Sequence, residues 1–240
     1  MTKTKHDPIW DMMGQLFRQH PWHGISIGED APECVVCYIE MVTTDTVKYE
    51  LDKATGLLKV DRPQKFSNVC PTLYGLIPQT YCAEGVGERC REVTGKEDVV
   101  GDHDPLDICV LTEKVVSHGD FLLHAYPIGG LRMIDGNEAD DKILAVMKDD
   151  RFYGHIRDVS ELPKPLIDRL KHYFLTYKEI PDYLSGDSDP GTASASRVEI
   201  PEVYSREEAW NVIQKSQEDY SNHFSDIKRM LTQMLRGPWL

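Results

Sequence analysis

The chain has 240 residues, of which 40% are hydrophobic and 28% charged, and its formal net charge is −13 at pH 7. This composition is that of a globular protein in water, and the length suffices for one domain with a sizeable core. The acidic balance disfavours nucleic acid and anionic membranes as partners, because such surfaces are bound by clusters of Lys and Arg. An anionic substrate would need local neutralisation, which divalent cations on acidic side chains can provide.

The N-terminal sequence MTKTKHDPIW has two lysines but no apolar stretch behind them, so it does not resemble a secretory signal. No segment approaches the ~18 consecutive apolar residues of a membrane span. We therefore expect a single domain over residues 1–240 that works in the cytoplasm, with an arm or short helix at residues 1–20. Its core is expected at about 31–180.

Six cysteines could form three disulfides, but a reducing compartment favours free thiols. Cys34 and Cys37 have the CxxC spacing of many zinc sites. They lie in a predicted strand, however, and no second Cys or His pair follows at zinc-finger spacing. Buried thiols are the expectation.

Strands are expected first along the chain. Residues 33–62 have strand patterns, and TVKYELDKATGLLKVDR places turn residues between two β-type runs, which predicts a hairpin. Lys48 and Glu50, two residues apart in its first strand, should share one face. Segment 83–101 is polar and contains glycine, so a loop is expected there. Further strands are expected at residues 69–76, 107–116 and 120–133.

Two helices are predicted in the second half. Apolar side chains recur at steps of three and four within residues 163–180: Leu166, Leu170, Tyr173, Phe174 and Tyr177. A flexible connection is expected at about 183–200 and a helical tail at 205–240, in which Ser205 and Glu208 fit a capping box. Its apolar stripe comprises Trp210, Ile213, Tyr220 and Phe224. Strands followed by helices favour an α+β fold, with an antiparallel sheet or barrel and helices outside it.

The stretch GDHDPLDICVL, residues 101–111, places Asp102, Asp104 and Asp107 within six positions, directly before a strand pattern. Clustered carboxylates repel one another unless they are solvated, protonated or neutralised by cations. Pro105 at the start of the strand would bend the chain so that the acids converge. A solvated acidic turn and a metal site both fit this pattern. An EF-hand loop does not, because its sixth position here is Asp107 rather than Gly and a strand follows.

A second acidic stretch, LRMIDGNEADDK at residues 131–142, follows another predicted strand. On its own it predicts a polar turn, because Gly136 and Asn137 favour turns. Together with the first acidic stretch it indicates a phosphate site with several metal ions.

These motifs resemble the family I soluble inorganic pyrophosphatases. GDHDPLD matches that family's D-small-D-P-apolar-D signature, and the surrounding motifs agree in order: Glu40, VKYE at 47–50, VDR at 60–62, YG at 74–75, MIDGNEADDK at 133–142 and HYFLTYK at 172–178. The resemblance covers roughly residues 31–180 and implies a five-stranded OB-like β-barrel with peripheral α-helices. Three features depart from the family pattern: His103 at a position usually small or amide, segment 83–101, and the linker at 183–200 with its long C-terminal tail.

The resemblance implies Mg²⁺-dependent hydrolysis of pyrophosphate to two orthophosphates. The implied metal ligands are Asp102, Asp107, Asp135, Asp140 and Glu40. Asp104 would accept the proton of the attacking water, Glu50 would act through water at the rim, and Lys142 would orient the second acidic stretch. Carboxylates suit this role because they are hard oxygen ligands for Mg²⁺.

The resemblance also implies residues that bind phosphate oxygens. Arg62, Tyr177 and Lys178 would bind the leaving phosphate, and Lys48 with Tyr74 the electrophilic one; Lys48, Arg62 and Tyr177 would assist Asp104 in catalysis. Family members assemble as dimers or hexamers, so a homo-oligomer is expected.

Two other functions compete with this interpretation. A non-catalytic protein that binds divalent metal or polyphosphate could use the same acids, but it has no use for the Arg, Tyr and Lys set. A nucleotide pyrophosphohydrolase needs a base-stacking pocket, for which the sequence gives no location.

Overall fold

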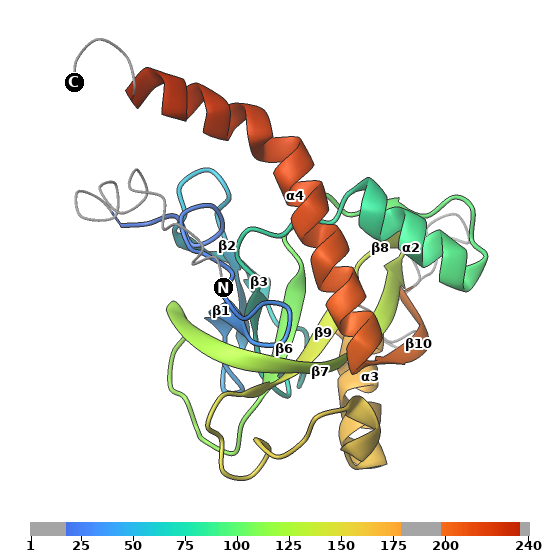
Figure 1. Ribbon diagram of the computed structural model, residues 1–240. Helices are drawn as coiled ribbons and strands as arrows, with labels where there is room; N and C mark the ends of the chain where they lie inside the picture. The colour runs from blue at the N-terminus through green and yellow to red at the C-terminus, as the bar shows by residue number, and fades with distance from the viewer. Residues whose placement is uncertain (1–17, 179–197, 236–240) are drawn as a thin grey trace, which may run out of the picture.

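Five strands pair into a closed ring at the centre of the protein (Figure 1). The computed structural model describes residues 18–178 and 198–235, with side chains as far as residue 225. The ring strands are β1 (Val35–Met41), β4 (Leu73–Leu76), β6 (Asp107–Leu111), β7 (Phe121–Asp135) and β9 (Lys142–Met147). They follow the order β1, β4, β6, β9 and β7, and β7 pairs with β1 to close the ring. With helices outside, this confirms the expected α+β fold and its OB-like arrangement of strands.

The sheet is mixed, whereas an antiparallel sheet or barrel was expected. Strands β6 and β9 are parallel, with Asp107 opposite Lys142, because the chain reverses direction twice between them, into β7 and out of it. Two predicted strands are also shorter than expected: β4 begins at Leu73 and β6 ends at Leu111. The short strands β5 (Val100–Gly101) and β8 (Glu138–Ala139) pair with each other and extend the sheet beside β7.

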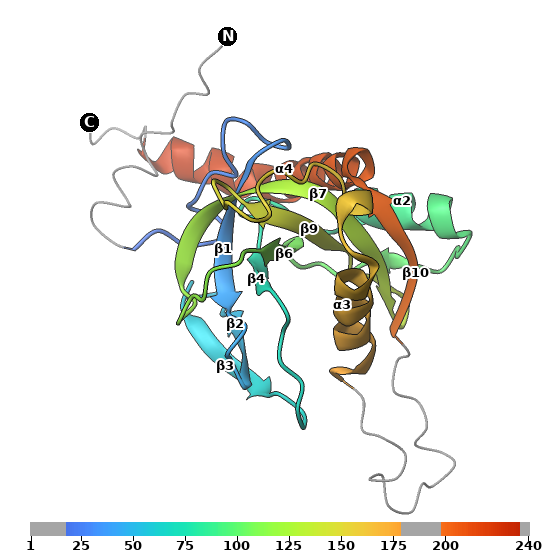
Figure 2. The same ribbon diagram turned by 90° about the horizontal axis from the view of Figure 1, so that it is seen from below.

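The predicted hairpin is confirmed as β2 (Val47–Leu51) and β3 (Leu58–Pro63). Lys48 and Glu50 share a face, with 3.3 Å between the Lys48 Nζ and a Glu50 carboxylate oxygen. The hairpin projects from the ring on the same side as helix α3 (Lys164–Thr176), and the two face each other (Figure 2). As expected, Leu170, Tyr173 and Phe174 of this helix are buried. A short 3-10 turn, η1 (Val159–Glu161), precedes it.

The C-terminal part of the chain forms a strand and a long helix. Residues 198–200, placed in the flexible connection, belong to strand β10 (Val198–Ser205), which pairs with β7. The C-terminal helix α4 spans Arg206–Leu235. The rest of that connection, residues 1–17 of the predicted arm and residues 236–240 lie outside the described residues. None of the described helices is both long and apolar enough to cross a bilayer.

The expected loop at 83–101 was wrong, because helix α2 (Glu84–Thr94) occupies most of it. The buried residues of this helix are Val86, Gly87 and Cys90. Because this buried face is narrow, most of the helix sequence is polar. The helix start is capped by another element rather than by its own sequence. The Asp219 carboxylate of α4 accepts hydrogen bonds from the backbone N–H groups of Ala83 (3.0 Å), Gly85 (3.0 Å) and Val86 (3.2 Å).

We expect Asp219→Ala to lower the free energy of unfolding by about 2 kcal/mol, because it leaves three amide groups at a helix start without their acceptor. Glu218→Ala is the matched control, since it removes the neighbouring, exposed carboxylate of α4 and should change stability by less than about 0.5 kcal/mol. Urea denaturation of both variants measures the difference. Equal losses in the two variants would contradict the capping role.

The predicted capping box at Ser205 and Glu208 was also wrong. The Glu208 carboxylate instead accepts hydrogen bonds from Arg89 of α2 and Arg132 of β7. Burial alone would raise the pKa of Glu208, but these hydrogen bonds outweigh it and lower the pKa to about 2. The Glu208 carboxylate therefore binds two arginines instead of capping the start of α4.

Arg132 is the centre of a buried ion network. Its side chain and that of Asp141 are both 0% exposed, and its guanidinium donates to an Asp141 carboxylate oxygen at 2.6 Å. The Tyr204 hydroxyl donates to the same oxygen at 3.2 Å, and the Tyr204 ring centroid lies 4.7 Å from the guanidinium carbon. The network joins β7, β10 and α4. The six cysteines, by contrast, are buried free thiols, as expected.

Candidate active site

One tight turn presents the first group of acids. It runs from Gly101, at the end of β5, to Asp107, at the start of β6. The main chain of Cys82 brackets the turn, since it accepts a hydrogen bond from the His103 N–H (2.9 Å) and donates one to the Asp104 carbonyl (2.8 Å). A side chain on Gly101 would place its Cβ 2.4 Å from the Cys82 carbonyl oxygen, so only glycine fits this approach.

A pocket opens between this turn, the hairpin and the ring strands. Its lining includes six of the residues predicted for the site, contributed by β1, β2, β4 and the acidic turn: Glu40, Lys48, Glu50, Tyr74, Asp104 and Asp107. The pocket is lined further by Leu51, Lys53, Leu76 and Pro105. The structure therefore brings together acids and cations that lie as much as 67 residues apart in the sequence.

Asp107 is the hub of the site. Its carboxylate accepts hydrogen bonds from the Tyr74 hydroxyl and from the Lys142 ammonium, which also donates to Asp140. The parallel pairing of β6 with β9 places Lys142 directly opposite Asp107. The Lys142 side chain is only 2% exposed, so water screens its attraction to these acids little. Lys142 is therefore more central than the supporting role predicted for it.

Two acids of the site carry strongly shifted pKa values. Burial, reinforced by the negative charge of Asp107, raises the pKa of Glu40 to about 8, although the Leu51 N–H donates to its carboxylate at 2.7 Å. Burial and the neighbouring Asp140 raise the pKa of Asp102 to about 9. Both shifts report carboxylates whose charge is poorly neutralised by the surrounding protein. A bound cation would favour their ionised forms.

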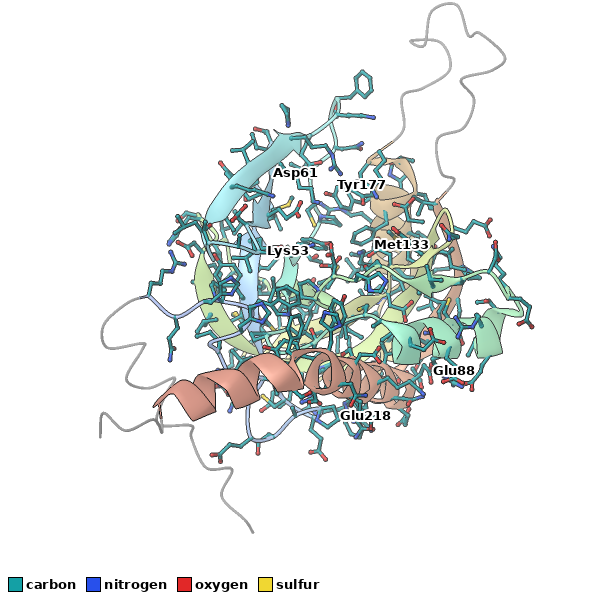
Figure 3. The ribbon with its side chains drawn as sticks, turned by 90° about the horizontal axis from the view of Figure 1, so that it is seen from above. Lys53, Asp61, Glu88, Met133, Tyr177 and Glu218 are labelled. Carbon is teal, nitrogen blue, oxygen red and sulfur yellow. The ribbon has the colours of Figure 1, made fainter. Side chains whose placement is uncertain are left out.

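Four further predicted residues lie at the edge of the site where α3 ends: Arg62, Asp135, Tyr177 and Lys178. The buried Tyr177 ring ends this helix, and the Arg62 guanidinium carbon lies 5.6 Å from its centroid. Lys178 donates to Asp135, which ends β7. Figure 3 shows Tyr177 on one side and the labelled hairpin residue Asp61 on the other, facing each other across the site.

Sequence reasoning missed two residues of the site. The Lys53 ammonium donates to the Asp104 carboxylate, although Lys53 was assigned only to the hairpin turn. Asp61 binds both predicted phosphate-binding cations of the hairpin, with 3.1 Å to the Lys48 Nζ and 2.5 Å to an Arg62 nitrogen. The VDR motif at 60–62 contains Asp61 and could have indicated it. No local pattern indicated Lys53.

The donor set suits a hard cation. Within residues 18–178 and 198–225, no three Asp, Glu, His or Cys side chains are arranged to hold one metal ion, and lysine ammonium groups bind four of the acids: Asp104, Asp107, Asp135 and Asp140. All the predicted ligands are nevertheless carboxylates, and Glu40 and Asp102 have raised pKa values in these surroundings. Oxygen donors of this kind fit Mg²⁺.

Comparison with known proteins gives a consistent result. A family model described as inorganic pyrophosphatase matches residues 37–221. The inorganic pyrophosphatase of Chlamydia caviae is 53% identical over 205 residues, which cover 85% of this chain and 92% of that protein. The soluble inorganic pyrophosphatase of Oryza sativa subsp. japonica is 42% identical over 160 residues, covering 67% of this chain and 66% of that protein.

A solved structure has the same fold. The crystal structure of the inorganic pyrophosphatase from Thermus thermophilus superposes with a TM-score of 0.66 at 26% identity, covering 85% of this chain and 99% of that one.

Proposed function

This chain belongs to the inorganic pyrophosphatase family and is an enzyme that hydrolyses inorganic pyrophosphate, and we propose that it does so with several Mg²⁺ ions. Family I pyrophosphatases are metal-dependent in general. The proposed ligands are Asp102, Asp107, Asp135, Asp140 and Glu40. When bound, Mg²⁺ neutralises phosphoryl oxygens and lowers the pKa of water. The observation that best supports this proposal is the convergence of acids from both acidic stretches on the buried Lys142.

The protein's own side chains are proposed to act on the two ends of the substrate. Asp104, on the lip of the pocket, accepts the proton of the attacking water. Arg62, Tyr177 and Lys178 bind the leaving phosphate, and Arg62 suits this role because its planar fork matches two phosphate oxygens.

Lys48 and Tyr74 are proposed to bind the phosphate that is attacked, which is consistent with their place in the pocket lining. Glu50 acts through water at the rim, where it holds Lys48. Lys142 orients Asp107 and Asp140.

A phosphate-release assay tests this function. Purified protein with millimolar Mg²⁺ should release phosphate from pyrophosphate much faster than from nucleoside triphosphates. No release from pyrophosphate would instead favour a protein that only binds metal or polyphosphate. Comparable release from triphosphates would favour a nucleotide pyrophosphohydrolase.

We expect Ca²⁺ to inhibit the Mg²⁺-dependent reaction. Ca²⁺ accepts longer and more variable coordination than octahedral Mg²⁺, so it would occupy the carboxylates and misplace the attacking water. Titrating Ca²⁺ into the assay at fixed Mg²⁺ measures the effect. Ca²⁺ alone supporting a rate close to that with Mg²⁺ would contradict this prediction.

We also propose that the protein works in the cytoplasm as a homo-oligomer of single-domain chains with a core at about residues 31–180. At micromolar concentration, light scattering should give a mass above the 27.4 kDa of one chain. A mass near that of the monomer would contradict the oligomer.

A further inference from the structure

Tyr81 lies between helix α4 and the acidic turn. On the side of α4, its backbone N–H donates to the Ser216 carbonyl at 2.9 Å. Its ring centroid lies 4.7 Å from that of His223 and 5.5 Å from that of Phe224. The Tyr81 side chain is thus packed against two successive residues of α4.

On the other side, the same tyrosine reaches the acidic turn. Its hydroxyl lies 2.9 Å from the Nδ1 of His103, the residue between Asp102 and Asp104. The next residue, Cys82, makes the two main-chain hydrogen bonds that bracket the turn. A short segment, Tyr81–Cys82, therefore binds α4 and the acidic turn at once.

His103 needs such support because of its backbone conformation. Its φ is 60°, in the left-handed region that glycine adopts freely and other residues adopt uncommonly. Such a conformation persists only where the surroundings hold it. The two contacts described here are the main-chain bond to Cys82 and the side-chain bond to Tyr81. Together with the hydrogen bond from the Asp104 N–H to the Asp102 carboxylate (3.0 Å), they hold the turn that carries Asp102 and Asp104.

We propose that α4 positions the acidic turn for metal binding through Tyr81 and His103. This inference rests on the proposed Mg²⁺ function of Asp102. Tyr81 and His103 are positioning residues, since they act through the conformation of the turn. Loosening the turn lowers the fraction of molecules whose carboxylates are ready to bind, and the apparent dissociation constant rises accordingly.

The test compares two tyrosines that make the same kind of bond. Tyr81→Phe removes only the hydroxyl bound to His103. Tyr220→Phe is the matched control, because the Tyr220 hydroxyl lies 2.9 Å from the Nδ1 of His23, also between α4 and the body of the protein but away from the turn. Calorimetric titration of Mg²⁺ without substrate should give a dissociation constant about three- to tenfold higher for Tyr81→Phe, the loss of one hydrogen bond. Tyr220→Phe should bind Mg²⁺ as the unmodified protein does.

A second variant separates positioning from stability. His103→Gly breaks the same link but suits the left-handed backbone, so it should weaken Mg²⁺ binding without lowering the thermal unfolding temperature in EDTA. The double variant Tyr81→Phe/His103→Gly should bind Mg²⁺ no more weakly than the single variants, because each removes the same contact.

Unchanged Mg²⁺ binding in Tyr81→Phe, an equal change in Tyr220→Phe, or multiplied effects in the double variant would each overturn the proposal. Failure of the proposed function is distinguishable from these outcomes. It would appear as an unmodified protein that releases no phosphate from pyrophosphate, whatever its Mg²⁺ affinity.

Discussion

Replacing Asp104 with asparagine is expected to lower turnover about 10²- to 10⁴-fold while leaving Mg²⁺ affinity nearly unchanged. The substitution removes a proton acceptor and retains the shape of the side chain. Asp104 lines the pocket beside Asp107, and Lys53 holds its carboxylate from the hairpin. Steady-state kinetics at several Mg²⁺ concentrations, with calorimetric titration of Mg²⁺, measure the two effects separately.

Asparagine at the proposed ligands should give the opposite result. Asp102→Asn and Asp107→Asn should weaken Mg²⁺ binding, and their activity should partly recover at higher Mg²⁺. If all three variants behaved alike, the separate roles given to the acids would be wrong.

His103 is the other candidate for the proton acceptor, because it lies next to Asp104 in the turn and histidine is the side chain that most often serves as a general base. Its Nδ1 contacts Tyr81 instead, and His103 is not part of the pocket lining. We therefore expect His103→Asn to keep most of its turnover at saturating Mg²⁺. Near-normal turnover in Asp104→Asn together with its loss in His103→Asn would make the histidine the acceptor.

The second large effect concerns stability. Arg132→Met is expected to lower the free energy of unfolding by about 3–5 kcal/mol, because it leaves Asp141 without its buried counter-ion. The Asp141 side chain is fully buried, and without Arg132 it would keep hydrogen bonds to neutral groups, such as the Tyr204 hydroxyl, but no cation of the network. Denaturation in guanidinium chloride measures the loss.

Arg89→Met is the matched control for Arg132→Met. Arg89 binds the same Glu208 carboxylate, but its side chain is 29% exposed and Glu208 would retain Arg132. Its loss should cost less than about 1 kcal/mol. Adding Asp141→Asn to Arg132→Met should restore part of the stability, since the isolated charge is then gone. A loss below about 1 kcal/mol in Arg132→Met would show that the network contributes little.

Local patterns predicted the hairpin and α3 well, because the turn residues and the three- and four-residue spacing fix those elements within a few positions. The candidate acids could also be identified from the sequence, because Asp102, Asp104 and Asp107 lie in one short motif. The sequence did not predict which cation binds which acid, although Lys142 itself was predicted as a site residue. Lys142 reaches Asp107 through parallel strand pairing, and Lys53 reaches Asp104 from a turn 51 residues earlier.

Helix α2 was not predicted, again because a stabilising contact comes from a distant part of the chain. Its sequence has few apolar residues and no capping side chain at Ala83, so the local pattern resembles a loop. The missing cap comes from Asp219, 136 residues further along the chain. Conversely, Ser205 and Glu208 matched a capping box, but Arg89 and Arg132 compete for the glutamate. Sequence spacing alone contains no information on such competition.

The contacts made by α4 affect how the protein can fold during synthesis. Glu208, Ser216 and Asp219 are translated after every strand of the ring, yet they complete partners at Arg132, Tyr81 and the start of α2. When only the ring strands have emerged from the ribosome, Arg132, the Tyr81 N–H and the start of α2 still lack these partners. We therefore expect the chain to reach its native fold only after α4 has been translated. Chains that terminate before Glu208 should accordingly be substrates for chaperones and proteases rather than partly active enzymes.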